Sequence, residues 1–256
     1  MGFYEEIAPY YEEIFPAGEE QLKFIMETAG DPPSRLLDVA CGAGLYSVKL
    51  AQKGYEVWAC DADLEMIRQA RQKAASLNGQ VTFFISDMQE LALPEEKGPN
   101  RREAAGFHCV FCIGNSIVHL NSTAAVGTAV KSMKKLLLPG GSLLLQIINF
   151  DRVLQQGVTS LPTLRNDKRG LTFTRKYDMD KTTGLIHFDT VLTLDRDGVP
   201  LEFNNRVDLF PLTSDMLNNI LRDAGFKTVK FYSDFNKNEF DLRESFMLVA
   251  AATVPV

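Results

Sequence analysis

The stretch LLDVACGAGLYSV, residues 36–48, joins an apolar strand pattern to a glycine-rich turn and then to a helical pattern. Such a strand–turn–helix unit places backbone N–H groups at the crevice beyond the carboxyl end of the strand. The dinucleotide fingerprint G-x-G-x-x-G requires a third glycine, but here Ser47 follows Gly42 and Gly44. Asp38 precedes the turn, and its carboxylate disfavours a pyrophosphate but favours a cationic amino group. We therefore expect a ligand that carries a positive charge and no phosphate.

Strand and helix patterns alternate around this stretch, which is typical of a parallel sheet with crossover helices. The expected strands are Arg35–Val39, Glu56–Asp61, Val81–Ser86, Phe107–Ile113 and Ser142–Asn149. The expected helices are Glu19–Ala29, Leu45–Lys53, Asp63–Leu77 and Ala124–Leu137. Pro139-Gly140-Gly141 is expected to end the last of these helices and to turn the chain into the fifth strand.

Beyond Asp151 the alternation stops and consecutive β-rich segments follow. These segments are Leu171–Asp178, Leu185–Asp195 and Pro200–Phe210. Because consecutive hairpins do not continue a strand–helix rhythm, we expect residues 151–211 to form an antiparallel insertion. The expected remainder is a helix capped by Thr213 or Ser214, followed by strands near Lys227–Tyr232 and Ser245–Thr253.

Composition and charge narrow the classes of function. The chain has 256 residues, a net charge of −6 and an isoelectric point near 5.2. Since phosphate binding requires a basic surface, no nucleic acid partner is expected. No apolar run reaches the length of a membrane span, so no membrane partner is expected either. All four cysteines lie in or beside expected strands, which favours reduced thiols in a cytoplasmic protein. Cys109 and Cys112 would face opposite sides of one strand, so no metal site is expected.

Acidic residues stand at the ends of three expected strands, namely Asp38, Asp61 and Asp87. Asp61 could accept hydrogen bonds from ribose hydroxyls, and Asp87 could accept one from an adenine amino group. Each residue alone could equally be a loop or cap residue, and Asp63 would cap the helix after Asp61 at least as well. Three such residues beside the two glycines make a stronger joint signal for a nucleoside site.

On these residues the sequence resembles the class I S-adenosylmethionine-dependent methyltransferases. LLDVACGAG is similar to their first motif, CDADLEMI to their second, ISDMQEL to their third and LLLPGGSLLLQ to the segment leading into their fifth strand. FCIGNSIVHL and INFDRVL most resemble glycine N-methyltransferase and related small-amine N-methyltransferases. The resemblance implies an α/β fold: a Rossmann-like, seven-stranded, mostly parallel sheet with helices on both faces and the antiparallel insertion before the last helix. It also implies one domain over residues 1–256, with residues 1–30 as an N-terminal lid.

The resemblance further implies S-adenosylmethionine as cofactor and S-adenosylhomocysteine as product. Gly42 and Gly44 would support the methionine part of the cofactor, Asp38 would lie near its ammonium group, and Asp61 would bind its ribose. The remaining implied cofactor contacts are Asp87 and the Met88 backbone at the adenine, Ile113 with Gly114 at the methionine, and Tyr11, Ala40, Ala62 and Met66.

Four residues are candidates on the acceptor side. Asn149, at the end of the fifth strand, could orient a substrate amine, as the resemblance suggests, or could simply begin a turn. His119 could act as a general base, although a histidine in this context is more often structural. Arg206 could pair with a substrate carboxylate, or it could be a solvated charge on a strand. Tyr4, like Tyr11, falls in the expected lid, where an aromatic ring could contact the ligand or merely pack.

The resulting prediction is a methyltransferase that acts on a small molecule, most simply by N-methylation of an amine or amino acid, and a homo-oligomer is compatible with it. One alternative is a non-catalytic protein that binds S-adenosylmethionine or S-adenosylhomocysteine. A less favoured alternative is an NAD-dependent dehydrogenase, against which both Ser47 and Asp38 argue.

Overall fold

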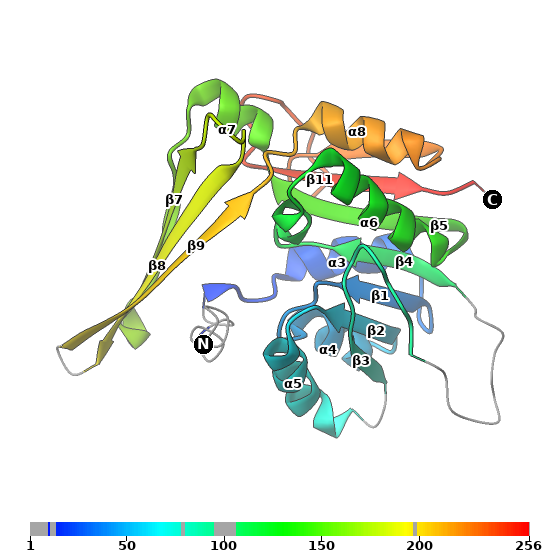
Figure 1. The fold of residues 1–256 in the computed structure, drawn as a ribbon. Coiled ribbons are helices and arrows are strands. Elements are labelled where there is room, and N and C mark those ends of the chain that lie inside the picture. Colours follow the sequence, from blue (N-terminus) through cyan, green and yellow to red (C-terminus); the bar gives the residue numbers. More distant parts are fainter. Residues whose placement is uncertain (1–9, 11–13, 78–79, 95–105, 197–198, 256) are drawn as a thin grey trace.

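A seven-stranded sheet forms the centre of the computed structural model, which describes residues 10, 14–77, 80–94, 106–196 and 199–255. Its strand order is β10-β11-β5-β4-β1-β2-β3 (Figure 1). The strands are β1 Arg35–Val39, β2 Glu56–Asp61, β3 Val81–Ile85, β4 Phe107–Cys112, β5 Leu137–Ile148, β10 Thr228–Tyr232 and β11 Met247–Thr253. Strand β11 runs antiparallel to both of its neighbours, and the other pairs are parallel. The predicted Rossmann-like α/β fold is confirmed.

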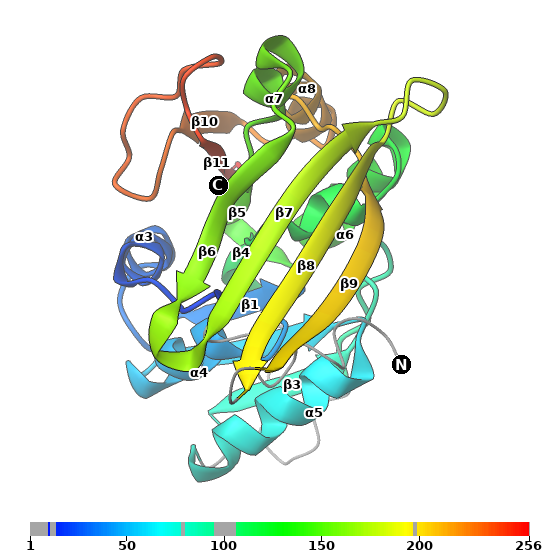
Figure 2. The ribbon, with the colours of Figure 1, turned by 90° about the vertical axis from the view of Figure 1, so that its left-hand side faces the viewer.

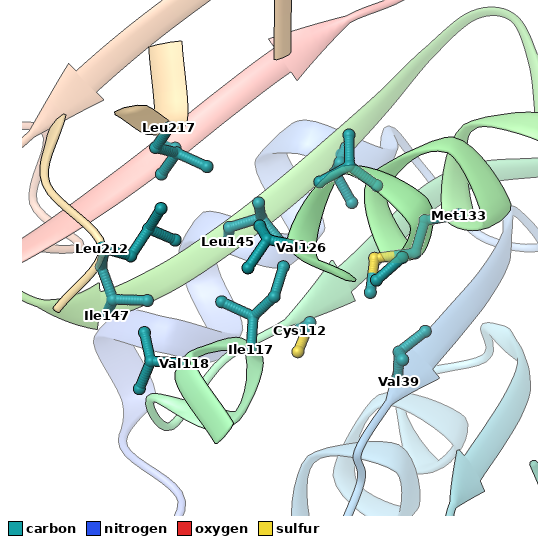
Figure 3. Close-up of a cluster of buried hydrophobic side chains, with 14 of the residues drawn as sticks. Val39, Cys112, Ile117, Val118, Val126, Met133, Leu145, Ile147, Leu212 and Leu217 are labelled. Atoms are coloured by element: carbon teal, nitrogen blue, oxygen red, sulfur yellow. The ribbon is translucent and has the colours of Figure 1, made fainter. Parts of the chain in front are cut away.

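Helices cover both faces of this sheet because each central strand is apolar on both sides. One face carries α3 Glu19–Ala29, α4 Leu45–Gln52 and α5 Leu64–Lys73, and the other carries α6 Thr123–Lys135 and α8 Ser214–Asp223. Leu36 and Leu37 of β1 are both fully buried but belong to the two different core clusters. Cys109 and Cys112 of β4 likewise belong to two different core clusters, and so they face opposite sides of the sheet as predicted. In Figure 3, Val126 of α6 and Leu217 of α8 lie in one cluster with Cys112.

A second sheet of four antiparallel strands stands between β5 and α8 in the sequence, which confirms the predicted insertion. Its strands, in order, are β6 Ser160–Asn166, β7 Leu171–Met179, β8 Ile186–Arg196 and β9 Val199–Leu209. Figure 2 shows it face-on, with strands of the larger sheet behind it. We call the side that faces the larger sheet the inner face, and the opposite side the outer face.

The insertion begins differently from the prediction. A helix, α7 Phe150–Gln156, comes first, and strand β6 follows it. Sequence patterns did not reveal β6, because it is an edge strand with Pro162 inside it and no regular alternation of buried positions.

Strand β5 begins at Leu137, earlier than predicted, and this corrects the role expected for Pro139-Gly140-Gly141. The pairing register shifts between Phe107, opposite Leu137, and Cys109, opposite Ser142. The proline and the two glycines fall in this irregularity, where Gly140 adopts a φ of 75°. They therefore form a bulge within the strand instead of a turn before it. The predicted helix Asp63–Leu77 is likewise divided into α5 and a 3-10 turn, η2 Ala74–Ser76.

The N-terminal segment divides into two parts. Helix α3 belongs to the core of the larger sheet, since Leu22, Phe24 and Ile25 are fully or almost fully buried there. Ile14 instead packs against the four-stranded sheet, beside Phe173 of its inner face. Residues 19–29 are thus part of the core of the larger sheet. Tyr4 and Tyr11 lie outside the described residues, so the lid over the ligand stays a prediction.

Candidate functional site

A cavity of about 430 Å³ lies where β1, β2, β3 and β4 end. Parallel strands bring their carboxyl ends to one edge of a sheet, so residues distant in sequence meet there. The lining residues are Ala40, Gly42, Asp61, Ala62, Asp63, Met66, Ser86, Met88, Gly114, Ser116 and His119. Seven of the residues predicted to contact a cofactor, Gly114 included, are among them, as is the predicted base His119.

The Asp61 carboxylate holds the glycine-rich turn in place. Its Oδ2 accepts a hydrogen bond from the Gly42 N–H at 2.8 Å, and its Oδ1 accepts one from the Asp63 N–H at 3.0 Å. The turn itself needs left-handed backbone, with φ of 59° at Ala40 and 53° at Gly42. Burial raises the pKa of Asp61 above its ordinary value, although the backbone N–H groups oppose this shift.

Asp38, Ser47 and Gly44 support the turn from behind and do not line the cavity. The Ser47 hydroxyl donates to Asp38 Oδ2 at 2.6 Å, and both side chains are buried. Burial raises the pKa of Asp38 to about 7. Gly44 precedes α4 with a φ of 75°, and a Cβ there would lie 2.8 Å from the Phe83 ring. The predicted contact between Asp38 and an ammonium group stays a prediction.

A second left-handed turn, at Gly114 and Asn115, closes the cavity on the side of β4. Gly114 donates its N–H to Gln146 Oε1 at 2.8 Å, and Asn115 Oδ1 accepts from the Ile148 N–H at 2.9 Å. Gly114 has a φ of 83°, and no heavy atom lies within 4 Å of the position a Cβ would take. That open space leaves room for a ligand. Ile113 itself packs into the core, so only its neighbour faces the cavity.

His119 ends the 3-10 turn η3, Ser116–His119, and lines the cavity together with Ser116. The imidazole is exposed to the cavity, yet the surrounding protein removes enough water to lower its pKa. At neutral pH the ring is therefore mostly uncharged and able to accept a proton.

The structure contradicts the substrate role expected for Asn149. Its side chain is fully buried and caps α7, with Oδ1 accepting from the Arg152 N–H at 3.3 Å. Its Nδ2 donates to the carbonyls of Leu242 at 3.0 Å and Ser245 at 2.9 Å, and lies 3.3 Å from that of Asp241. No amide hydrogen remains for a substrate, so Asn149 is a structural residue.

The structure also contradicts the role expected for Arg206. Its guanidinium forms two hydrogen bonds to Asp189, at 2.6 and 2.7 Å, on the outer face of the four-stranded sheet. Asp87 is exposed, does not line the cavity, and accepts a hydrogen bond from the Gln89 N–H at 2.7 Å. Its contact with an adenine stays a prediction.

Sequence reasoning missed three lining residues, Asp63, Ser86 and Ser116. Asp63 was expected as a helix cap and is one, since its Oδ1 accepts from the N–H groups of Glu65 and Met66. Its position beside Asp61 could have suggested a second role at the same strand end. The two serines gave no such signal, because a serine after a strand is common in any loop.

Comparisons with known proteins point to one family. A model described as a methyltransferase domain matches residues 36–141. A glycine/sarcosine N-methyltransferase of Aphanothece halophytica is 25% identical over 234 residues, covering 91% of this chain and 80% of the relative. Among solved structures, an S-adenosylmethionine-dependent methyltransferase from Clostridium acetobutylicum covers all of both chains with a TM-score of 0.80 and 15% identity. An amino pentose methyltransferase from Micromonospora echinaspora has a TM-score of 0.65 and 18% identity, covering 99% of this chain and 92% of its own.

Fold, cavity and comparisons together define an S-adenosylmethionine-dependent methyltransferase of the class I fold. Within that class, the chain is related to the glycine N-methyltransferases. The cavity fits this cofactor: Asp61 offers a carboxylate to ribose hydroxyls, Met66 and Met88 offer apolar surface to a base, and Gly114 leaves open space. Among the helices of the described residues, none is long and apolar enough to cross a membrane. The same residues contain no cluster of side chains suited to hold a metal ion.

Proposed function

We propose that this methyltransferase N-methylates a small molecule that carries an amino group, in the class of the amino acids. The observation that carries the proposal is the position of His119, whose imidazole lines the same cavity as the residues suited to the cofactor and whose pKa is lowered by burial. An amine must lose its ammonium proton before its lone pair can attack a methyl group, and a neutral histidine can take that proton. The name of the Aphanothece halophytica relative, glycine/sarcosine N-methyltransferase, supports the same class of acceptor.

The residues of the site divide the work between binding and proton transfer. Asp61 and the turn at Gly42 would hold the ribose, and Met66 and Met88 would cover the adenine. When bound, S-adenosylmethionine supplies an electrophilic methyl group. His119 accepts the proton of the acceptor's ammonium group. The rest of the catalytic effect is alignment and exclusion of water, and alignment alone can contribute about 7–11 kcal/mol.

The free thiols of all four cysteines also fit the expected cytoplasmic compartment.

The test is a methyl-acceptance screen with S-adenosylmethionine and glycine, sarcosine, ethylamine and an aminosugar, with S-adenosylhomocysteine formation as readout. We expect turnover with at least one amine, and a turnover number that falls about 10²–10⁴-fold in His119→Gln. The pH at which the wild-type rate reaches half its maximum should lie below the ordinary histidine value, because the pKa of His119 is lowered.

Calorimetry with S-adenosylhomocysteine serves as the control for folding of the His119→Gln variant. Methylation of a hydroxyl group of the aminosugar, with no methylation of any amine in the panel, would disprove N-methylation. Unchanged turnover in His119→Gln would remove the proposed base.

A further inference from the structure

A set of polar side chains interrupts the apolar inner face of the four-stranded sheet. In β7, Leu171, Phe173 and Tyr177 are buried on that face, and alternation places Arg175 among them. Leu171 and Phe173 pack with Ile14, whereas Tyr177 packs with the core of the larger sheet. Arg175 therefore lies between two apolar regions, with its guanidinium carbon 6.0 Å from the centre of the Phe173 ring.

Neighbouring elements add further polar groups beside Arg175 and Tyr177. Thr190 of β8 is directly opposite Arg175 in the strand register and is 2% exposed. Arg152 of α7 stacks on Phe246, and its charge, like that of Arg175, acts on the Tyr177 hydroxyl. We call Arg152, Arg175, Tyr177 and Thr190 the polar band.

Each member of the polar band has a buried polar atom without a hydrogen-bond partner. These atoms are Arg152 Nε, Arg175 Nε, Tyr177 Oη and Thr190 Oγ1, and in the described part of the chain they are all the side-chain atoms of this kind. Buried polar groups are nearly always paired, because a buried unpaired donor loses its water without compensation. Four such atoms at one place indicate that a ligand completes their hydrogen bonds.

The polar band is positively charged, and among the described strand residues no carboxylate pairs with it, although Arg175 Nη2 donates to the carbonyl of Pro162 in β6 at 2.7 Å. The carboxylates of Asp178, Asp189 and Asp208 alternate to the outer face, where Asp189 pairs with Arg206. Arg175 is half-buried, and this partial loss of solvent lowers the pKa of its guanidinium. All four groups can donate hydrogen bonds, and two guanidiniums suit the oxygens of an anion.

The polar band is connected to the cofactor cavity through the end of β9. The Phe210 N–H donates to the carbonyl of Val118 at 2.8 Å. Val118 belongs to η3, in which Ser116 and His119 line the cavity. Val118 and Tyr177 share one core cluster. The inner face thus adjoins the side of the cavity that carries the proposed base.

We propose that the polar band binds an anionic group, a carboxylate or a phosphate, of the methyl acceptor and so selects anionic over neutral amines. This inference rests on the proposed function, because it assigns the acceptor side of the same site. Arg175 and Arg152 neutralise the anion, while Thr190 and Tyr177 complete its hydrogen bonds.

The test measures binding without turnover. The complex with S-adenosylhomocysteine is titrated with acetate, inorganic phosphate and methylammonium, and binding is followed by NMR. We expect one of the two anions to bind, acetate indicating a carboxylate and phosphate a phosphate ester, and methylammonium to bind more weakly. Arg175→Met should weaken anion binding about 10- to 100-fold, because a charge-assisted contact is lost.

Lys176→Met is the matched control, because Lys176 is the next residue of β7 and is exposed on the outer face. It should bind the anion as the wild type does. Thr190→Val, which keeps the side-chain shape, is a second variant and should weaken binding to a smaller extent. Retained affinity for S-adenosylhomocysteine shows that each variant is folded.

Absence of binding by either anion, or equal binding in Arg175→Met and wild type, would overturn the inference. These outcomes are separable from failure of the proposed function. A protein that binds an anion at the polar band but methylates no amine contradicts only the proposed function. One that methylates amines without any preference for anionic acceptors contradicts only this inference.

Discussion

Asp38 and Ser47, the two residues that depart from a dinucleotide fingerprint, are partners in one hydrogen bond. In the fingerprint a third glycine allows the helix and the strand to pack closely. Here Ser47 occupies that position, is fully buried, and donates to the Asp38 carboxylate at 2.6 Å. The serine is tolerated because the buried carboxylate satisfies its hydroxyl. The sequence alone showed two separate anomalies, and the structure joins them into one contact beneath the turn.

Asp38 should make the stability of the ligand-free protein depend on pH. Its folded pKa of about 7 is raised from the ordinary 3.8, so between these values the folded state holds a proton that the unfolded chain has lost. Stability from this group is therefore lost as the pH rises from about 4 to about 7, by ~4 kcal/mol at most. Urea unfolding of Asp38→Asn should lack this slope, while Asp215→Asn, at an exposed position of α8, should keep it. Identical pH profiles for Asp38→Asn and wild type would contradict the assignment.

Asp61 is the residue on which cofactor binding should depend most. In Asp61→Asn one carboxylate oxygen becomes an amide donor, which opposes either the Gly42 or the Asp63 N–H and removes the charge offered to the ribose. We expect the dissociation constant of S-adenosylhomocysteine to rise about 10- to 100-fold, measured by calorimetry. Asp215→Asn again provides the control. An unchanged dissociation constant would exclude Asp61 from the site.

At the scale of elements, α7 joins the larger sheet to the insertion. Its N-cap residue, Asn149, fixes the start of the helix to the C-terminal region. Asn149 links the first turn of α7 to the carbonyls of residues 241–245, which lie between β10 and β11. Asp151 of the same helix accepts a hydrogen bond from the Ser214 N–H at 2.8 Å, at the start of α8. The first turn of α7 is thus held to two segments of the C-terminal region.

Asn149→Ala should destabilise the protein rather than impair substrate binding alone. The variant loses the cap of α7 and leaves buried carbonyls unpaired, so we expect a loss of about 2–4 kcal/mol in the free energy of unfolding, measured in urea. Gln156→Ala is the matched control, because Gln156 forms one exposed hydrogen bond, to the Arg243 carbonyl, and should cost less than about 1 kcal/mol. Full stability combined with a raised KM in Asn149→Ala would restore the substrate role that the sequence suggested.

For the whole molecule, binding of the cofactor product should raise thermal stability. S-adenosylhomocysteine at 100 times its dissociation constant adds about 2.7 kcal/mol, which corresponds to roughly 5–10 °C in Tm for a chain of this size. NAD should produce no shift, because a carboxylate lies beneath the turn that a pyrophosphate would need to approach. The measurement is a thermal scan with each ligand, and Asp61→Asn should show a smaller shift at the same concentration. A shift with NAD alone would contradict the assignment of the cavity.

The sequence by itself determined the class of the fold and pointed to most of the residues that line the cavity. The contacts on the cofactor side are local, since β1, its turn and α4 are consecutive, and Asp61 and Met66 follow the next strand directly. Periodicity and turn chemistry located the glycine turn and Asp61, whereas Met66 was implied by the resemblance to the methyltransferases. His119 was also found, because it follows the fourth strand closely.

The tertiary structure alone decided the acceptor side, because the partners there are distant in sequence or depend on strand register. From the sequence, the Asn149 amide could have bound a substrate. In the structure it donates hydrogen bonds to carbonyls that are 92 to 96 residues away in the chain. Arg206 and Arg175 each stand in a β-rich segment of the sequence. In a strand, successive side chains point to opposite faces, so a shift of one residue moves a side chain from one face of the sheet to the other. Pairing with Asp189 holds Arg206 on the outer face, whereas the register of β7 with β8 places Arg175 beside Thr190 on the inner face. No local pattern encodes that register, so only the folded chain shows which arginine lies on the inner face of the four-stranded sheet.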